Sequence, residues 1–437
     1  MSISSTGLDT GLLRSFENNL LRHGTPTIKR FAANSGSILE ASHSQELAMI
    51  DSAQRSLRPL FGKGAPVRPS IGDHPDFMHL KGTDDVCYCP ITTMFMDIEG
   101  STRLSLLYDL ETVRAIKNAF IQSAIQIVQS FDGHVHRIMG DAVMAFFGGT
   151  TSTNESSTIN GINAAAVLQH FAEKVVRPRL DEIGCDHDFG IRIGLDFGQK
   201  ENVLWSTYGY PGVEEVTATS FYVDVAAKLQ HAASRNQAMF GASIVSEIDF
   251  PECLVGVKTV QKNGSVVDVP FIQPNHTDRD GKPANYRQQF LRSADYLACT
   301  PIAHSSGDYP ILGKQPLSVT AEEYSSDKSY RFGTYEACSR ALPKNRKLKF
   351  QIQLPYMPML PYTVTFTVEN NGSEAWSKNP EDGGNHSSVH EIRTQNQHYN
   401  TFAHWESTEY RGLHFMTIEV KTHHGVQYRT KFGVYVE

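Results

Sequence analysis

Two aspartates, Asp97 and Asp141, stand where short apolar segments stop, and their type and position point to chemistry. Asp97 closes an apolar run that begins at Met94, and Asp141 follows Gly140 between two further apolar runs. If these runs form neighbouring strands, both carboxylates rise at the same edge of one sheet. Two carboxylates in that position are the minimum needed to hold divalent cations against a triphosphate.

A turn of small residues follows Asp97 almost directly. Gly100, Ser101 and Thr102 precede a predicted helix, so their backbone N–H groups are available to phosphate oxygens. Glycine at the first position lets the backbone approach a ligand closely. A phosphate-binding turn beside the two carboxylates is therefore expected.

Length and composition narrow the class of protein. The 437 residues exceed one compact domain, and 40% of them are hydrophobic, which is enough for real cores. The net charge of -7 argues against a nucleic-acid partner. The sequence has no apolar run of membrane-spanning length and no secretory signal pattern. We therefore expect no membrane partner. Because the six cysteines are scattered, we expect reduced thiols and a cytoplasmic location.

Alternating strands and helices between residues 88 and 275 predict a layered α/β domain. Gly140 and Asp141 are expected to join two strands as a two-residue hairpin, and the Ser/Thr/Asn-rich stretch 150–159 is expected to be a loop. The expected strands are 91–98, 135–139, 142–147 and 191–197, and the expected helices are 111–129, 162–180 and 221–233.

The segments on either side of this domain differ from it in composition and in hydrophobic periodicity. Residues 1–87 show helical periodicity at 12–21 and 46–57, which predicts a helical N-terminal arm. Residues 276–340 are rich in Asn, Asp, Ser, Gly and Pro, which predicts a loop-rich linker. Residues 341–437 alternate apolar and polar residues between turns, which predicts an all-β sandwich-like domain. Its expected strands are 348–354, 362–368, 413–420 and 428–436.

Three segments together resemble the class III nucleotidyl cyclases. FMDIEGST at 95–102 and MGDAVMAFFG at 139–148 are similar to the two metal-site motifs of that family, and TATSFYVDVAAKL at 217–229 is similar to its transition-state helix. The resemblance implies a ferredoxin-like βαββαβ core. It also implies a reaction in which the ribose 3′-OH of a nucleoside triphosphate attacks the α-phosphate and pyrophosphate leaves.

The resemblance further implies the parts of the site. Two divalent ions, Mn²⁺ or Mg²⁺, would be held by Asp97, the backbone carbonyl of Ile98 and Asp141. Such ions lower the pKa of the attacking hydroxyl and bind the charge that develops on both oxygens. The implied substrate-binding residues are Phe95, Gly100, Ser101, Thr102, Arg137 and Thr217.

Base recognition departs from the usual family pattern. Purine-specific members place a lysine three residues before the hairpin glycine, where this chain has Arg137. Adenylate cyclases often carry Asp or Thr at the position of Thr217. The longer arginine, with its planar fork of donors, would fill the space that a smaller base leaves and would meet the carbonyl oxygens of uracil. The same donors could meet O2 and N3 of cytosine, so the residues alone leave the two pyrimidines open.

The transition-state helix departs too. Family members usually carry Asn and Arg four residues apart, and this chain carries Asp224 and Lys228, which the resemblance makes the catalytic residues. Such a pair is also typical of an ordinary surface ion pair. A further phosphate-binding lysine is expected downstream, at Lys258 or Lys262.

This combination is similar to the bacterial pyrimidine cyclases of antiphage defence systems. The resemblance implies a uridylate cyclase that makes cyclic UMP from UTP as a second messenger, a β-rich C-terminal nucleotide-sensor domain, and a homodimer with composite active sites. A cytidylate cyclase that makes cyclic CMP is the first alternative, and an adenylate or guanylate cyclase follows it. A degenerate domain that binds nucleotide and regulates a partner is the non-enzymatic alternative.

Overall fold

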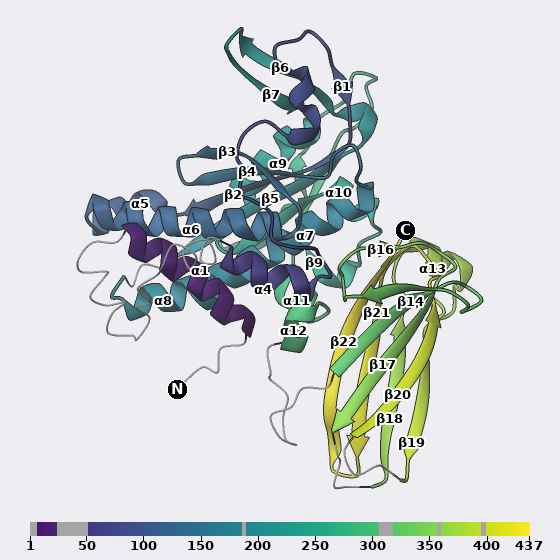
Figure 1. The fold of residues 1–437 in the computed structure, drawn as a ribbon. Coiled ribbons are helices and arrows are strands. Elements are labelled where there is room, and N and C mark those ends of the chain that lie inside the picture. The colour runs from purple at the N-terminus through teal and green to yellow at the C-terminus, as the bar shows by residue number, and fades with distance from the viewer. Residues whose placement is uncertain (1–6, 24–50, 186–188, 306–317, 356–359, 395–398) are drawn as a thin grey trace.

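The computed structural model describes residues 7–23, 51–185, 189–305, 318–355, 360–394 and 399–437 (Figure 1). They form a mixed α/β body with a long β-sandwich beside it. Among these residues, no helix combines the length and apolarity that a bilayer crossing requires.

An eight-stranded sheet organises the α/β body. Its order is β12-β13-β8-β5-β2-β4-β3, with β9 paired to β13. The strands are β2 (Ile91–Glu99), β3 (His134–Met139), β4 (Ala142–Phe147), β5 (Gly190–Gly198), β8 (Gln237–Gly241), β9 (Val255–Gly256), β12 (Phe271–Gln273) and β13 (Tyr286–Leu291).

The centre of the sheet confirms the predicted ferredoxin-like core. Helix α6 (Leu110–Ser130) connects β2 to β3, and α7 (Asn154–His170) connects β4 to β5. The resulting order β5-β2-β4-β3 is the 4-1-3-2 arrangement of a βαββαβ unit, with neighbouring strands antiparallel. The predicted strand–turn pattern around both aspartates is therefore confirmed.

The two faces of the sheet have different roles. Met94, Met96 and Ile98 of β2 are buried in the large core on the side of α6 and α7. The alternate residues face α9 (Phe221–Ala232), which packs closely on β5. Gly194 permits this approach, because a Cβ there would lie 2.1 Å from the Ala226 carbonyl oxygen. The α9 face is thus the one that Asp97 shares.

Two N-terminal helices, α1 (Gly7–His23) and α4 (Ser52–Leu60), pack against α6 on the side away from the sheet (Figure 1). Residues 46–50 of the predicted second helix lie outside the described residues. Because Leu12 and Phe16 belong to the same buried core as the sheet, α1 is an integral layer of the body.

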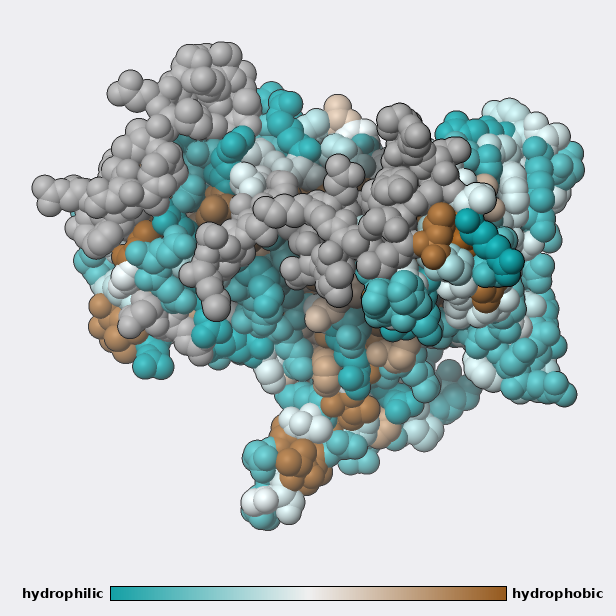
Figure 2. All heavy atoms as spheres, turned by 90° about the horizontal axis from the view of Figure 1, so that it is seen from below, coloured by the Kyte–Doolittle hydropathy of each residue, from teal (hydrophilic) through white to brown (hydrophobic). Residues whose placement is uncertain are grey.

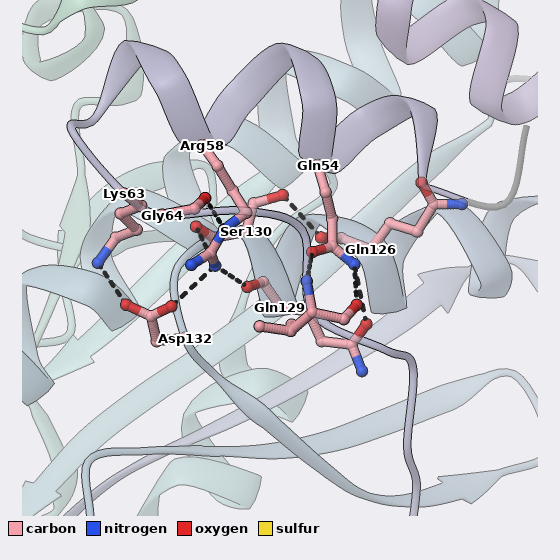
Figure 3. A network of polar contacts seen from close by, with 9 residues as sticks. Gln54, Arg58, Lys63, Gly64, Gln126, Gln129, Ser130 and Asp132 are labelled. Carbon is pink, nitrogen blue, oxygen red and sulfur yellow. Dashed lines mark hydrogen bonds and ion pairs between the residues drawn. The ribbon is translucent and has the colours of Figure 1, made fainter. Parts of the chain in front are cut away.

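Polar contacts fix α4 to the end of α6 (Figure 3). Arg58, only 6% exposed, donates to the carbonyl oxygens of Gln129 at 2.9 Å and Gly64 at 2.8 Å. It also pairs with Asp132 at 2.8 Å, and Lys63 holds the other oxygen of that carboxylate at 2.7 Å. Burial acts to raise the pKa of Asp132, but Lys63 and Arg58 hold it below its usual value.

An arm of three strands projects from the body at the top of Figure 1. It consists of β1 (Cys87–Tyr88), β6 (Leu204–Tyr210) and β7 (Val213–Thr219). Trp205 anchors its base by stacking on Phe77 of η1 (Pro75–Leu80) at 3.9 Å between ring centroids. Tyr210 and Val213, at the tip of the β6–β7 hairpin, are 82% and 79% exposed.

The C-terminal region confirms the predicted sandwich. One sheet has the order β15-β14-β17-β20 and the other β16-β22-β21-β18-β19. Their facing side chains form a separate core, and the outer surface, at the right of Figure 2, is mostly hydrophilic. The strands are β14 (Ser318–Tyr324), β15 (Arg331–Tyr335), β16 (Ala341–Leu342), β17 (Lys347–Pro355), β18 (Tyr362–Glu369), β19 (His386–Ile392), β20 (Tyr399–Ser407), β21 (Gly412–Thr422) and β22 (Gly425–Val436).

Two sequence expectations about loops are wrong. The stretch 150–159 is largely helical, because Thr153 caps α7 by accepting a hydrogen bond from the Ser156 N–H. Residues 276–340 are more than a linker, since β13 extends the α/β sheet and β14 and β15 belong to the sandwich. Short helices complete the chain: α8 (Arg177–Glu182), α10 (Ala242–Glu247), α11 (Ser293–Leu297), α12 (Pro301–Ser305) and α13 (Ser373–Lys378), with a π-helical turn at Phe171–Val176 and 3-10 turns at Lys200–Asn202 and Glu252–Leu254.

The sandwich and the body share buried contacts. The Tyr435 hydroxyl donates to the Tyr296 hydroxyl at 3.2 Å, and Tyr296 donates to Asn163 at 2.8 Å. Leu413 and Phe415 of the sandwich belong to the core cluster of the body. The two parts are therefore joined by packing as well as by the chain.

Candidate active site

Asp97 lies near the end of β2 on the α9 face. Its Oδ2 accepts from Arg192 Nη2 at 2.6 Å and from Gln230 Nε2 of α9 at 3.4 Å. Arg192 is the cross-strand partner of Asp97 on β5. One predicted metal ligand is thus held by a guanidinium.

Asp141 lies in the predicted hairpin turn. Gly140 has a φ of +67°, which glycine adopts without strain. The pairing of Met96 with Val143 places Asp141 level with Ile98, one residue from Asp97. Asp141 Oδ2 is buried and has no hydrogen-bond partner among the described residues. A buried carboxylate oxygen without a partner is costly unless a ligand satisfies it.

These two carboxylates fit a divalent cation. Both are acceptor-only oxygen ligands, which Mg²⁺ and Mn²⁺ prefer. The Ile98 side chain is buried in the core, so only its backbone could contribute. Within the described ranges, no three His, Cys, Asp or Glu side chains gather as a metal site. Any cation here would therefore rely on water or substrate oxygens for its remaining ligands.

The predicted phosphate turn has the expected form. Gly100 adopts a left-handed φ of +72° and precedes α5 (Ser101–Leu107), and no side chain caps this helix. The first backbone N–H groups of α5 are therefore not used by a capping side chain. Phe95, another predicted substrate contact, lies two residues before Asp97 on the α9 face of β2, partly buried against the core at the base of the arm.

Arg137 lies on β3 beside an irregularity in the sheet. The register of β3 against β4 shifts between Val135 and Arg137, which is typical of a bulge that redirects a side chain. Arg137 Nε donates to Glu215 Oε2 at 2.8 Å, and Nη2 pairs with the other carboxylate oxygen. The two side chains are 37% and 39% exposed. Arg137 is thus fixed by an acid on the arm and still open to solvent.

Thr217 shares its strand face with Glu215, since residues two apart on a strand point the same way. The intervening Val216 is buried. Thr217 therefore lies on the face of the arm that carries the acid of the Arg137–Glu215 pair.

Asp224 and Lys228 lie one turn apart on the exposed side of α9, while Val225 and Leu229 are buried. Neither Asp224 nor Lys228 makes a side-chain hydrogen bond or ion pair within the described part of the chain. The surface ion pair that their spacing allowed does not form.

The two downstream lysines differ. Lys258 Nζ donates to the carbonyl oxygen of Ala232 at the end of α9. Burial lowers the pKa of Lys258. Lys262 lies on β10 (Thr259–Lys262), an exposed strand paired with β11 (Ser265–Asp268). Lys258 is therefore the one attached to α9.

Sequence reasoning missed Arg192 and Glu215. Both are defined by side-chain contacts with residues more than 70 positions away in the sequence. For Glu215 a weak signal existed, because a residue two positions before Thr217 on a strand shares its face.

Comparison with known proteins identifies the family of the chain. Residues 302–437 match the family described as the adenylyl/guanylyl and SMODS C-terminal sensor domain. A cytidylate cyclase of Escherichia coli is 35% identical over 399 residues, which cover 88% of this chain and 87% of that protein. A cytidylate cyclase of Staphylococcus aureus is 33% identical over 371 residues, which cover 83% and 82%.

A crystal structure of the adenylyl cyclase CyaB of Pseudomonas aeruginosa is 18% identical, covers 47% of this chain and 95% of its own, and gives a TM-score of 0.38. The identity and coverage of the cytidylate cyclases define the relationship, and the chain belongs to this bacterial family of class III nucleotidyl cyclases.

Proposed function

We propose that this nucleotidyl cyclase converts CTP to 3′,5′-cyclic CMP and pyrophosphate. The observation that carries the choice of base is the Arg137–Glu215 pair, which presents hydrogen-bond donors and an acceptor side by side. The names of the curated relatives support the same choice.

The edge of cytosine complements that pair. Cytosine presents O2 and N3 as acceptors and the N4 amino group as a donor, and carboxylates are the usual acceptors for N4. Arg137 would donate to O2 or N3, and Glu215 would accept from N4. Uracil places a carbonyl oxygen where cytosine has its amino group, so the Glu215 carboxylate would repel it.

UTP is the second candidate. Arg137 offers several donors in a planar fork, which suit the two carbonyl oxygens of uracil. This alternative requires Glu215 to turn away from the base.

Different residues of the site would bind the metal ions, the phosphates and the ribose during cyclisation. Asp97 and Asp141 would hold divalent ions. When bound, such ions supply a lowered pKa for the ribose 3′-OH and charge neutralisation at the leaving pyrophosphate. The Gly100 turn and Arg192 lie beside Asp97 and would receive phosphate oxygens. Asp224 and Lys228 would reach the ribose and the α-phosphate from α9.

A homodimer with composite sites is part of the proposal. Within one chain, no hydrogen bond or ion pair among the described residues joins the Asp97 group to the Arg137–Glu215 pair. Apolar residues near Arg137 and at the arm tip are exposed, including Met139 at 43% and Tyr210 at 82%. A second copy that covers them would bring its own base-binding group to the first copy's carboxylates.

Mixing two inactive variants tests this arrangement. Asp97→Ala and Arg137→Ala should each abolish turnover. After random subunit exchange, half of the dimers are heterodimers with one intact site, so about a quarter of wild-type activity should return. No recovery after confirmed subunit exchange would contradict composite sites.

One product assay tests the chemistry. The purified protein is incubated with each of the four nucleoside triphosphates and Mn²⁺, and products are identified by mass. Cyclic CMP as the main product supports the proposal, and cyclic UMP supports the second candidate. A cyclic purine would refute both, and no product at all would favour a regulatory, non-catalytic domain.

Two wider assignments are also proposals. The body up to residue 305 would be the catalytic domain, and the sandwich would be a sensor. The cyclic nucleotide would serve as a second messenger in antiphage defence. Loss of phage protection in cells that carry Asp97→Ala in place of the wild type would support that role.

A further inference from the structure

The sandwich contains a cavity of about 220 Å³ at the end of its two sheets. This volume is smaller than the ~300–1,000 Å³ of pockets that hold drug-sized ligands. Its floor consists of side chains that the two sheets turn inward: Leu348, Phe350, Val368, Met416, Val434 and Val436. These walls favour an apolar ligand.

Polar groups gather at the rim of the cavity. Glu406 Oε1 faces two imidazoles, with His404 Nε2 at 2.6 Å and His386 Nε2 at 3.1 Å. The other oxygen, Oε2, has no hydrogen-bond partner among the described residues. It is therefore an acceptor that a ligand could use.

The contacts of the two imidazoles favour the ionised form of Glu406. His386 Nδ1 faces the Gly384 carbonyl oxygen at 3.0 Å and Nε2 faces the carboxylate, so both nitrogens act as donors. Burial opposes this charge, but these contacts raise the pKa of His386. Burial also acts to raise the pKa of Glu406, and the bonds from His404 and His386 lower it below its usual value.

The charge of the lining disfavours ligands that carry a phosphate group. Glu406 and Glu409 are the acids of the lining, and the described residues that line the cavity include no Lys or Arg. A phosphate group would face two carboxylates, with only the His386 ring, itself engaged by Glu406, to offset their charge. A nitrogen heterocycle with N–H donors would find an apolar slot and a free acceptor.

We propose that this cavity binds a small planar nitrogen heterocycle without phosphate, which donates N–H to Glu406 Oε2. The proposal goes beyond cyclisation and concerns a second site on the chain. It also narrows the nucleotide-sensor expectation to the base part of a nucleotide.

The rim of the cavity is tied to the catalytic body. Thr408, Tyr410 and His414 line it, and between them Arg411 donates to the Glu247 carbonyl oxygen of α10. Asp249 accepts from the Ser373 N–H at 2.6 Å, which attaches α13 beside the same rim. A ligand that moves residues 408–414 would therefore also displace α10.

Binding to the full chain tests the proposal. Adenine, cytosine and 2-aminobenzimidazole are titrated by ligand-observed NMR against AMP and CMP. We expect a heterocycle to bind and its affinity to fall by about tenfold or more in Glu406→Gln, because a hydrogen bond to a charged acceptor is lost. Glu391→Gln, an exposed acid paired with Arg393, should leave binding unchanged.

Several outcomes would overturn the proposal. They are no binding by any heterocycle, binding that Glu406→Gln leaves intact, or tighter binding by the monophosphates at this site. His386→Gln, at a half-exposed rim position, gives a second variant if Glu406→Gln fails to fold. It should weaken binding, because it removes the imidazole that orients Glu406.

Discussion

Glu215→Gln is the substitution that tests base selection most directly. In the wild type the carboxylate accepts from Arg137 through both oxygens and remains over a third exposed. The amide of glutamine keeps one acceptor and adds a donor, which suits O4 of uracil. We therefore expect the preference for CTP over UTP to fall.

The magnitude follows from the contacts. A good side-chain contact to a base edge contributes ~1–3 kcal/mol of discrimination. Because the pair is partly solvated, the lower part of that range applies, about 1–2 kcal/mol. At 1.4 kcal/mol per tenfold, the ratio of kcat/KM for CTP to that for UTP should change by about 5- to 30-fold.

The assay measures kcat/KM for CTP and UTP in parallel, with product identity checked by mass. Glu214→Gln is the matched control, since it alternates to the other face of β7 and should leave the ratio unchanged. An equal loss for both substrates in Glu215→Gln would refute base reading by Glu215. That result would leave Glu215 only to position Arg137.

Three further perturbations probe the metal site, the packing and a buried proton. Asp141→Asn should lower activity by about a hundredfold or more at saturating Mn²⁺, because its oxygen is the unpartnered one, and circular dichroism should show an unchanged fold. Arg58→Met should reduce the free energy of unfolding by about 2–3 kcal/mol in urea titrations, since the buried carbonyl oxygen of Gln129 and the partly buried one of Gly64 lose a charged donor. Arg55→Met, at an exposed position, should change it by less than about 0.5 kcal/mol. Burial raises the pKa of Asp196 to about 7 from 3.8, so the folded state keeps a proton that the unfolded state releases, and stability should fall as pH rises between these values. Asp196→Asn should remove this slope, and identical slopes in the two proteins would contradict the assignment.

The local features of the fold could be predicted from the sequence. Apolar runs that stop at Asp97 and Asp141 set two strand ends, and the helical period of 111–129 identified α6 within a residue at each end. Such patterns depend on neighbours in the chain. The start of α7 was missed because its capping Thr153 lies in a Ser/Thr-rich stretch that looks like a loop.

Features that depend on distant partners could not be predicted. β13 is a strand because β8 pairs with it, and β14 because β17 does, while their own residues are largely polar. In the site, the predicted residues occupy the expected elements. The guanidinium beside Asp97 and the acid beside Arg137 emerge only when the strands are assembled.

The buried seam between Tyr435 and Tyr296 has a practical consequence for experiments on regulation. Leu413, Phe415 and Tyr435 contribute to the core of the α/β body, so a chain truncated before the sandwich would expose that core to water. Heating should accordingly melt both parts in one calorimetric transition. A truncated chain that lost activity would report loss of folding, whereas a point substitution at Arg411 would separate communication between the parts from their shared stability.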